Sequence, residues 1–135
     1  MTQGAPAFEH PGVAAAFDAF PRGARDRLMQ VRRLIFEVAA QTDRVGRISE
    51  TLKWGQPAYL TPDTKSGSTL RLGVPKGGGA AIFAHCQTSI ISDFGGLFPG
   101  TFRLDGNRAV LLPEKGALPV ASLRMLIRSG LTYHL

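Results

Sequence analysis

The sequence predicts an α+β domain of two layers, in which helices pack on one face of an antiparallel sheet. Three observations favour this class. Residues 21–42 carry apolar side chains at a helical period, alternation of apolar and polar residues appears after residue 56, and glycine-containing turns join the alternating segments. Hairpin connections make neighbouring strands antiparallel, and helices then cover the apolar face of such a sheet.

The helices of the N-terminal third are predicted from spacing. A short helix should run from Pro11 to Asp18, because proline favours a first turn and Val13 and Phe17 lie four residues apart. A longer helix follows over residues 21–42, with an apolar stripe on one side and arginines mostly on the other. The stripe contains Leu28, Val31, Ile35 and Val38, and the arginines are Arg25, Arg27, Arg32 and Arg33.

The stretch "ETLKWGQPAYL", residues 50–60, contains the only tryptophan and predicts a corner between a helix and a strand. Ser49 suits the N-cap of one helical turn, and Gly55 suits the left-handed residue that ends it. Pro57 then directs the chain into an extended strand over residues 58–60. On this interpretation Trp54 fills core volume while its indole N–H reaches a carbonyl.

Two hairpins are expected in the second half. Residues 69–74 alternate as in a half-buried strand, and the three glycines at 77–79 permit the reversal into the next strand. The sequence "TFRLDGNRAVLL" predicts the second hairpin, in which Asp105 and Gly106 form a two-residue turn.

Two further helices complete the expected fold. Ile90, Phe94 and Leu97 lie at helical spacing, and this helix should stop at Gly95, Gly96 and Pro99. The last helix should begin at Pro119. Its expected inward residues are Val120, Leu123, Ile127 and Leu131, with Arg124 and Arg128 outward.

One domain accommodates the whole sequence. Its 135 residues, 44% hydrophobic and 19% charged, are typical of a globular protein. We expect a flexible tail over residues 1–10 and a single domain over residues 11–135. A lone cysteine, Cys86, fits a reducing cytoplasm. The absence of both a signal pattern and an apolar run of roughly 20 residues argues against a membrane partner.

Several segments together resemble the YdhG-type domain of unknown function, over about residues 13–134. The motif Lys-Trp-Gly-x-Pro-x-Tyr in "ETLKWGQPAY" carries most of the resemblance, with "FPRGARDRLMQVRRLI", "AIFAH", "GNRAV" and "SLRMLIRSGLTYH". The resemblance implies a small bacterial cytosolic domain of helices on an antiparallel sheet, without established catalytic residues. Some members are described as frataxin-like iron chaperones, which makes iron delivery one alternative function.

The residues themselves favour neither metal binding nor catalysis. The ten acidic residues are spread singly, whereas iron delivery requires clustered carboxylates. His85 and Cys86 are neighbours on an expected strand and should point to opposite faces. No nucleophile pattern is present, and "PKGGGA" lacks the Gly-Lys-Ser/Thr ending of a phosphate-binding loop. We therefore expect a non-enzymatic protein without a cofactor, a metal site or catalytic residues.

The expected function is binding of a small ligand or a protein partner near the tryptophan. Six residues are the candidates: Trp54 and Tyr59 as an apolar wall, Gln56 and His85 as polar points, and Lys53 and Arg71 as attraction for an anion. A formal net charge of +6 leaves open nucleic-acid or other polyanion binding through the arginine-rich helix, as a less favoured alternative. A homodimer is a further alternative.

Overall fold

The computed structural model describes residues 5–135, in which four helices and six strands form one α+β unit. The helices are α1 (Pro11–Ala19), α2 (Arg22–Gln41), α3 (Ile90–Leu97) and α4 (Val120–Leu131). The strands are β1 (Ser49–Lys53), β2 (Gln56–Leu60), β3 (Leu70–Gly73), β4 (Ala81–Ala84), β5 (Arg103–Asp105) and β6 (Ala109–Leu111).

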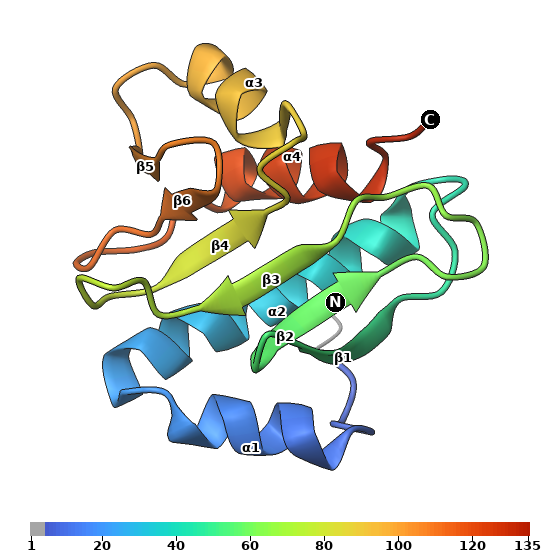
Figure 1. The fold of residues 1–135 in the computed structure, drawn as a ribbon, viewed down its shortest axis with the longest axis horizontal. Helices are drawn as coiled ribbons and strands as arrows, with labels where there is room; N and C mark the ends of the chain where they lie inside the picture. The colour runs from blue at the N-terminus through green and yellow to red at the C-terminus, as the bar shows by residue number, and fades with distance from the viewer. Residues whose placement is uncertain (1–4) are drawn as a thin grey trace.

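All six strands form one antiparallel sheet in the order β1-β2-β3-β4-β6-β5. The predicted α+β class and the antiparallel sheet are therefore confirmed. In the view of Figure 1, α2 and α4 lie behind the sheet, α1 lies below it and α3 lies above it. The β4 to β5 connection contains α3, and the chain then returns as a hairpin, which places β6 beside β4.

Strand register separates the side chains of the sheet into two faces. Tyr59 and Leu70 pair across β2 and β3, and both belong to the face that α2 and α4 contact. The Tyr59 ring meets Phe36 of α2 edge to face, with ring centroids 6.1 Å apart. Gly130 of α4 lies so close to Leu70 that an added Cβ would come within 2.8 Å of the leucine side chain. We call the opposite face, which carries Arg71 and Phe83, the outer face.

The predicted corner at the tryptophan is wrong. Residues 49–53 form strand β1 instead of a helical turn, and they pair with β2 along its whole length. Trp54 and Gly55 have φ angles of 55° and 73°, which is the left-handed pair required of a two-residue type I′ hairpin turn. Trp54 is 89% exposed and does not fill the core.

The long helix and both later hairpins form where the sequence predicts them. Helix α2 covers nearly all of residues 21–42, and Leu28 and Ile35 of its apolar stripe are fully buried. Gly78 and Gly79 adopt positive φ between β3 and β4. The second hairpin has a turn one residue longer than expected, because Asp105 pairs with Ala109.

Two helices depart from the predictions in detail. Helix α3 continues through Gly95 and Gly96 but ends at Leu97, before Pro99. A Cβ at Gly95 would come within 2.8 Å of the Leu104 side chain, which accounts for a glycine inside the helix. Helix α4 is capped by Pro119 as expected. Its first residue, Val120, is exposed instead of inward, since the apolar stripe becomes buried only from Leu123.

Part of the expected tail packs on the domain. Residues 5–10 have no regular secondary structure, yet the ring of Phe8 lies 5.4 Å from that of Phe17. His10 caps α1 by accepting a hydrogen bond from the Val13 N–H at 3.2 Å. The remaining residues of that tail, 1–4, lie outside the described residues.

Candidate functional site: the tryptophan hairpin and the outer face of the sheet

Four of the six predicted site residues lie at or near one end of the sheet. Lys53 and Gln56 pair across the β1 to β2 hairpin, and Trp54 lies in the turn between them. Arg71 lies beside them on β3, and the ring of Phe83 on β4 completes the surface. We call these five residues, Lys53, Trp54, Gln56, Arg71 and Phe83, the tip surface.

Trp54 is the most unusual residue of the tip surface. Its side chain is almost fully exposed, and its backbone has a positive φ that residues other than glycine and asparagine seldom adopt. A large aromatic side chain in water at a strained turn contributes little to folding. Exposed tryptophans are, by contrast, frequent anchors of protein interfaces.

Arg71 is held in a fixed orientation on the outer face. Its Nη1 donates a 2.7 Å hydrogen bond to Oε1 of Gln56, and its guanidinium lies 5.5 Å from the centre of the Phe83 ring. Gly73 makes room for this arrangement, because a Cβ there would collide with the Gln56 amide. Burial lowers the pKa of Arg71 from its usual value, since the guanidinium is partly removed from water. An anion bound here would compensate for that lost hydration.

Tyr59 does not belong to this surface, which corrects the expected apolar wall. Alternation along β2 turns it toward the helices, where its hydroxyl donates a 2.7 Å hydrogen bond to Oε2 of Glu50. Burial, followed by the negative charge of Glu50, raises the pKa of Tyr59 far above its usual value.

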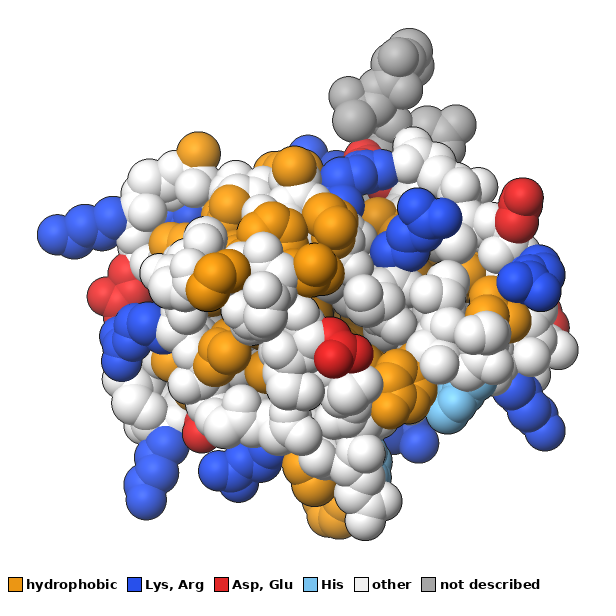
Figure 2. Space-filling view, turned by 90° about the horizontal axis from the view of Figure 1, so that it is seen from above, with side chains coloured by type: hydrophobic (Ala, Val, Ile, Leu, Met, Phe, Trp, Pro, Cys, Tyr) orange, Lys and Arg blue, Asp and Glu red, His pale blue; other side chains and the backbone are white. Residues whose placement is uncertain are grey.

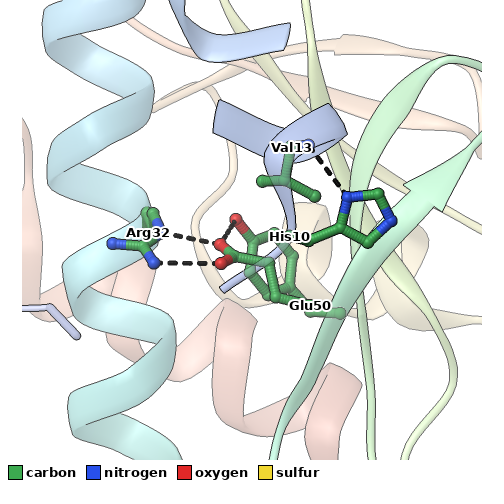
Figure 3. A network of polar contacts seen from close by, with 5 residues as sticks. His10, Val13, Arg32 and Glu50 are labelled. Carbon is green, nitrogen blue, oxygen red and sulfur yellow. Dashed lines mark hydrogen bonds and ion pairs between the residues drawn. The ribbon is translucent and has the colours of Figure 1, made fainter. Parts of the chain in front are cut away.

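Glu50 accepts a second interaction, from Arg32 of α2 (Figure 3). Arg32 Nε and Nη2 donate to the two carboxylate oxygens at 2.6 and 2.9 Å. The guanidinium lies 4.0 Å from the ring centre of Phe8 and 5.2 Å from that of Phe36. The network joins the N-terminal segment, α2 and the hairpin that carries Trp54, so it supports the candidate site without contacting it.

This buried network could not be found from the sequence. The helical period places Arg32 beside Val31 and Ile35 at the border of the apolar stripe, but the predicted helix treats it as an outward residue. In the structure Arg32 is only 2% exposed. Its partner, Glu50, lies 18 residues away in a segment that the sequence predicts as a helical turn, so no local pattern joins the two.

His85 lies away from the tip surface. Phe83 pairs with Arg71, so His85, two residues further along the chain, lies toward the opposite end of the sheet from Trp54. Its Nδ1 accepts a hydrogen bond from the Gln87 N–H, and both His85 and the neighbouring Cys86 are exposed. The structure therefore removes His85 from the candidate site.

The arginine-rich helix offers fewer free cations than its sequence indicates. Arg32 forms an ion pair with Glu50, and Arg27 donates a hydrogen bond to the backbone oxygen of Glu114 at 3.4 Å. On α4, Arg124 forms an ion pair with Glu37 at 3.0 Å and also contacts Gln41.

Residues 5–135 contain neither a metal-binding cluster nor a membrane-spanning helix. No group of three or more His, Cys, Asp or Glu side chains is arranged to hold a metal ion. None of the helices in the same range combines the length and apolar character of a membrane span.

The resemblance to the YdhG-type domain stays a prediction. No protein-family model, curated protein or solved structure matches the chain.

Proposed function

We propose that this chain is a non-enzymatic cytoplasmic domain that binds an acidic protein partner through the tip surface. The exposed Trp54 side chain carries the proposal. The left-handed backbone at Trp54 lowers the stability of the fold, and the exposed indole makes few contacts that offset this cost. A role in binding explains why a tryptophan occupies this position. The indole protrudes from a hairpin turn, and a protruding anchor suits a pocket on a partner protein better than a small ligand.

The charge of the tip surface indicates the chemistry of the partner. Lys53 and Arg71 form no ion pair within residues 5–135, and both belong to the outer face. The hydrogen bond to Gln56 already orients the Arg71 guanidinium. Binding of a partner carboxylate would therefore cost little additional side-chain entropy. A segment with an apolar pocket or side chain next to Asp or Glu would complement this surface.

Selection of displayed peptides against the purified chain tests the proposal. We expect enriched peptides to be acidic and to contain an apolar anchor. Trp54 is the only tryptophan, so its fluorescence should shift to the blue when a synthetic copy of an enriched peptide buries the indole. Trp54→Asn should abolish binding, and Arg71→Gln should weaken it about tenfold, as expected for the loss of one charged hydrogen bond.

The matched control is Arg128→Gln, which removes an exposed cation from α4, away from the hairpin. Peptide affinity should be unchanged in this variant. If acidic peptides bind equally well to Trp54→Asn, or if a single-stranded oligonucleotide binds tightly while the peptides do not, a protein partner at the tip surface is wrong.

A homodimer is a second proposal, supported by one observation. Figure 2 shows hydrophobic side chains gathered on the face seen from above, around α3. Exposed large apolar residues of α3, β5 and α4 are Leu97, Leu104, Val120 and Met125, and Leu97 is 60% exposed. Analytical ultracentrifugation tests this proposal: Leu97→Asp should remove a dimer, and a single 14.5 kDa species of the unmodified chain at high concentration would overturn it.

A further inference from the structure

A second hollow lies at the same end of the sheet as the tip surface. Figure 1 shows the β3 to β4 turn and the loop after β6 side by side at the left of the molecule. Together with the beginning of β5 they line an open cavity of about 700 Å³, a volume within the usual range of ligand sites. Strands β2 and β6 are three strand spacings apart, or about 14 Å, so the cavity is distinct from the tryptophan hairpin.

Three cations line this cavity from separate segments of the chain. Lys76 comes from the β3 to β4 turn, Arg103 from the start of β5 and Lys115 from the loop after β6. None of them forms an ion pair with a described residue. The acidic lining residues are Asp105, which pairs with Arg108 at 3.6 Å, and Glu114. The cavity therefore has an excess of positive charge.

The glycine turn leaves room for an anion to approach the backbone. A Cβ added at Gly77 or Gly78 would meet no atom within 4 Å, which indicates open space beside the turn. Gly78 and Gly79 have φ angles of 90° and 82°. The Gly78 N–H closes the turn by donating to the Pro75 oxygen at 2.9 Å, so the turn contributes open space and the cations contribute the attraction for an anion.

Another part of the lining is apolar. Phe102 and Leu111 line the cavity beside the cations, and Leu111 pairs with Arg103, so the two side chains share a face of the sheet. The Phe102 ring is fixed from behind by Phe94 of α3, with ring centroids 4.9 Å apart. A half-exposed aromatic wall next to three cations fits a molecule that carries both a flat ring and phosphate groups.

We infer that this cavity binds a phosphorylated metabolite of nucleotide size. Its phosphates contact Lys76, Arg103 and Lys115, and its ring lies against Phe102 and Leu111. The inference does not depend on the proposed protein partner, because Trp54 does not line the cavity.

Isothermal titration calorimetry with ADP, pyrophosphate and adenosine tests the inference on the full chain. We expect ADP to bind, pyrophosphate to bind more weakly, and adenosine to bind weakest, because the cations provide most of the attraction. Arg103→Gln should weaken ADP about tenfold, the size expected for one charged hydrogen bond. In amide NMR spectra, ADP should shift the signals of residues 76–79 and of Lys115.

The matched control is Lys65→Gln, which removes an exposed cation from the β2 to β3 connection at the other end of the sheet. ADP affinity should change less than twofold in this variant, and it should also be retained in Trp54→Asn. Circular dichroism confirms that each variant is folded. Absence of ADP binding at millimolar concentration, or equal affinity of Arg103→Gln and Lys65→Gln for ADP, would overturn the inference.

Discussion

Replacing Trp54 by asparagine should raise the stability of the fold while it removes binding. The side chain is 89% exposed, so only about 25 Å² of its surface is buried, and losing this burial costs about 0.6 kcal/mol. The left-handed backbone, at φ 55°, costs an ordinary residue about 1–2 kcal/mol, and asparagine relieves much of that strain. Asn-Gly is also the preferred pair for a type I′ turn.

The expected net gain is about 0.5–1 kcal/mol, which corresponds to a rise in Tm of roughly 2–3 °C for a domain of this size. The measurement is urea unfolding followed by circular dichroism, because the variant lacks the only tryptophan. Trp54→Ala is the companion variant: it loses the same small burial but keeps the strained backbone, so it should be no more stable than the unmodified chain.

Arg44→Asn supplies a matched control for strain. Arg44 is exposed and has a φ angle of 68°, so asparagine there should give a similar gain without changing peptide binding. If Trp54→Asn instead lost about 3–5 kcal/mol, the cost typical of truncating a buried tryptophan, the indole would belong to the core. The hairpin geometry and the proposed tip surface would then both be wrong.

The remaining predictions concern packing and pH. Gly130→Ala should destabilise the fold by about 1–2 kcal/mol, because its Cβ would collide with Leu70, whereas Gly23→Ala in α2, with open space around it, should stabilise by about 0.5 kcal/mol. Equal effects in thermal melts would contradict this packing. Tyr59→Phe should cost about 1.5–2 kcal/mol, because it removes a hydrogen bond to the Glu50 carboxylate. The raised pKa of Tyr59 means that above about pH 10 the unfolded chain loses this proton while the folded chain keeps it. Stability should then fall by about 1.4 kcal/mol per pH unit, and urea titrations should show a shallower fall in Tyr59→Phe.

The ion pair between Arg32 and Glu50 supports the hairpin that carries the candidate site. Both side chains are nearly excluded from water, and removal of either would leave the other as an uncompensated buried charge. The pair fixes β1 against α2 and, with it, the base of the hairpin that presents Trp54.

Local patterns in the sequence were sufficient for the helix α2 and the two later hairpins. A helical period over 20 residues has few alternative explanations, and the glycines at 77–79 and at Gly106 permit backbone angles that other residues avoid. The same patterns placed Lys53, Gln56 and Arg71 near the tryptophan as candidates. They could not decide which of these side chains share a face.

Tertiary structure decided the role of the motif around Trp54. Ser49, Gly55 and Pro57 are compatible with a helical turn followed by a strand, and equally with two strands joined by a tight turn, because a left-handed glycine ends a helix or forms a hairpin. Residues 49–53 pair with β2, which in turn pairs with β3, so the segment forms a hairpin. The indole then lies in the turn, where it is exposed to water. Strand alternation then turns Tyr59 inward to Glu50 and leaves Arg71 outward, a choice set by neighbours distant in sequence.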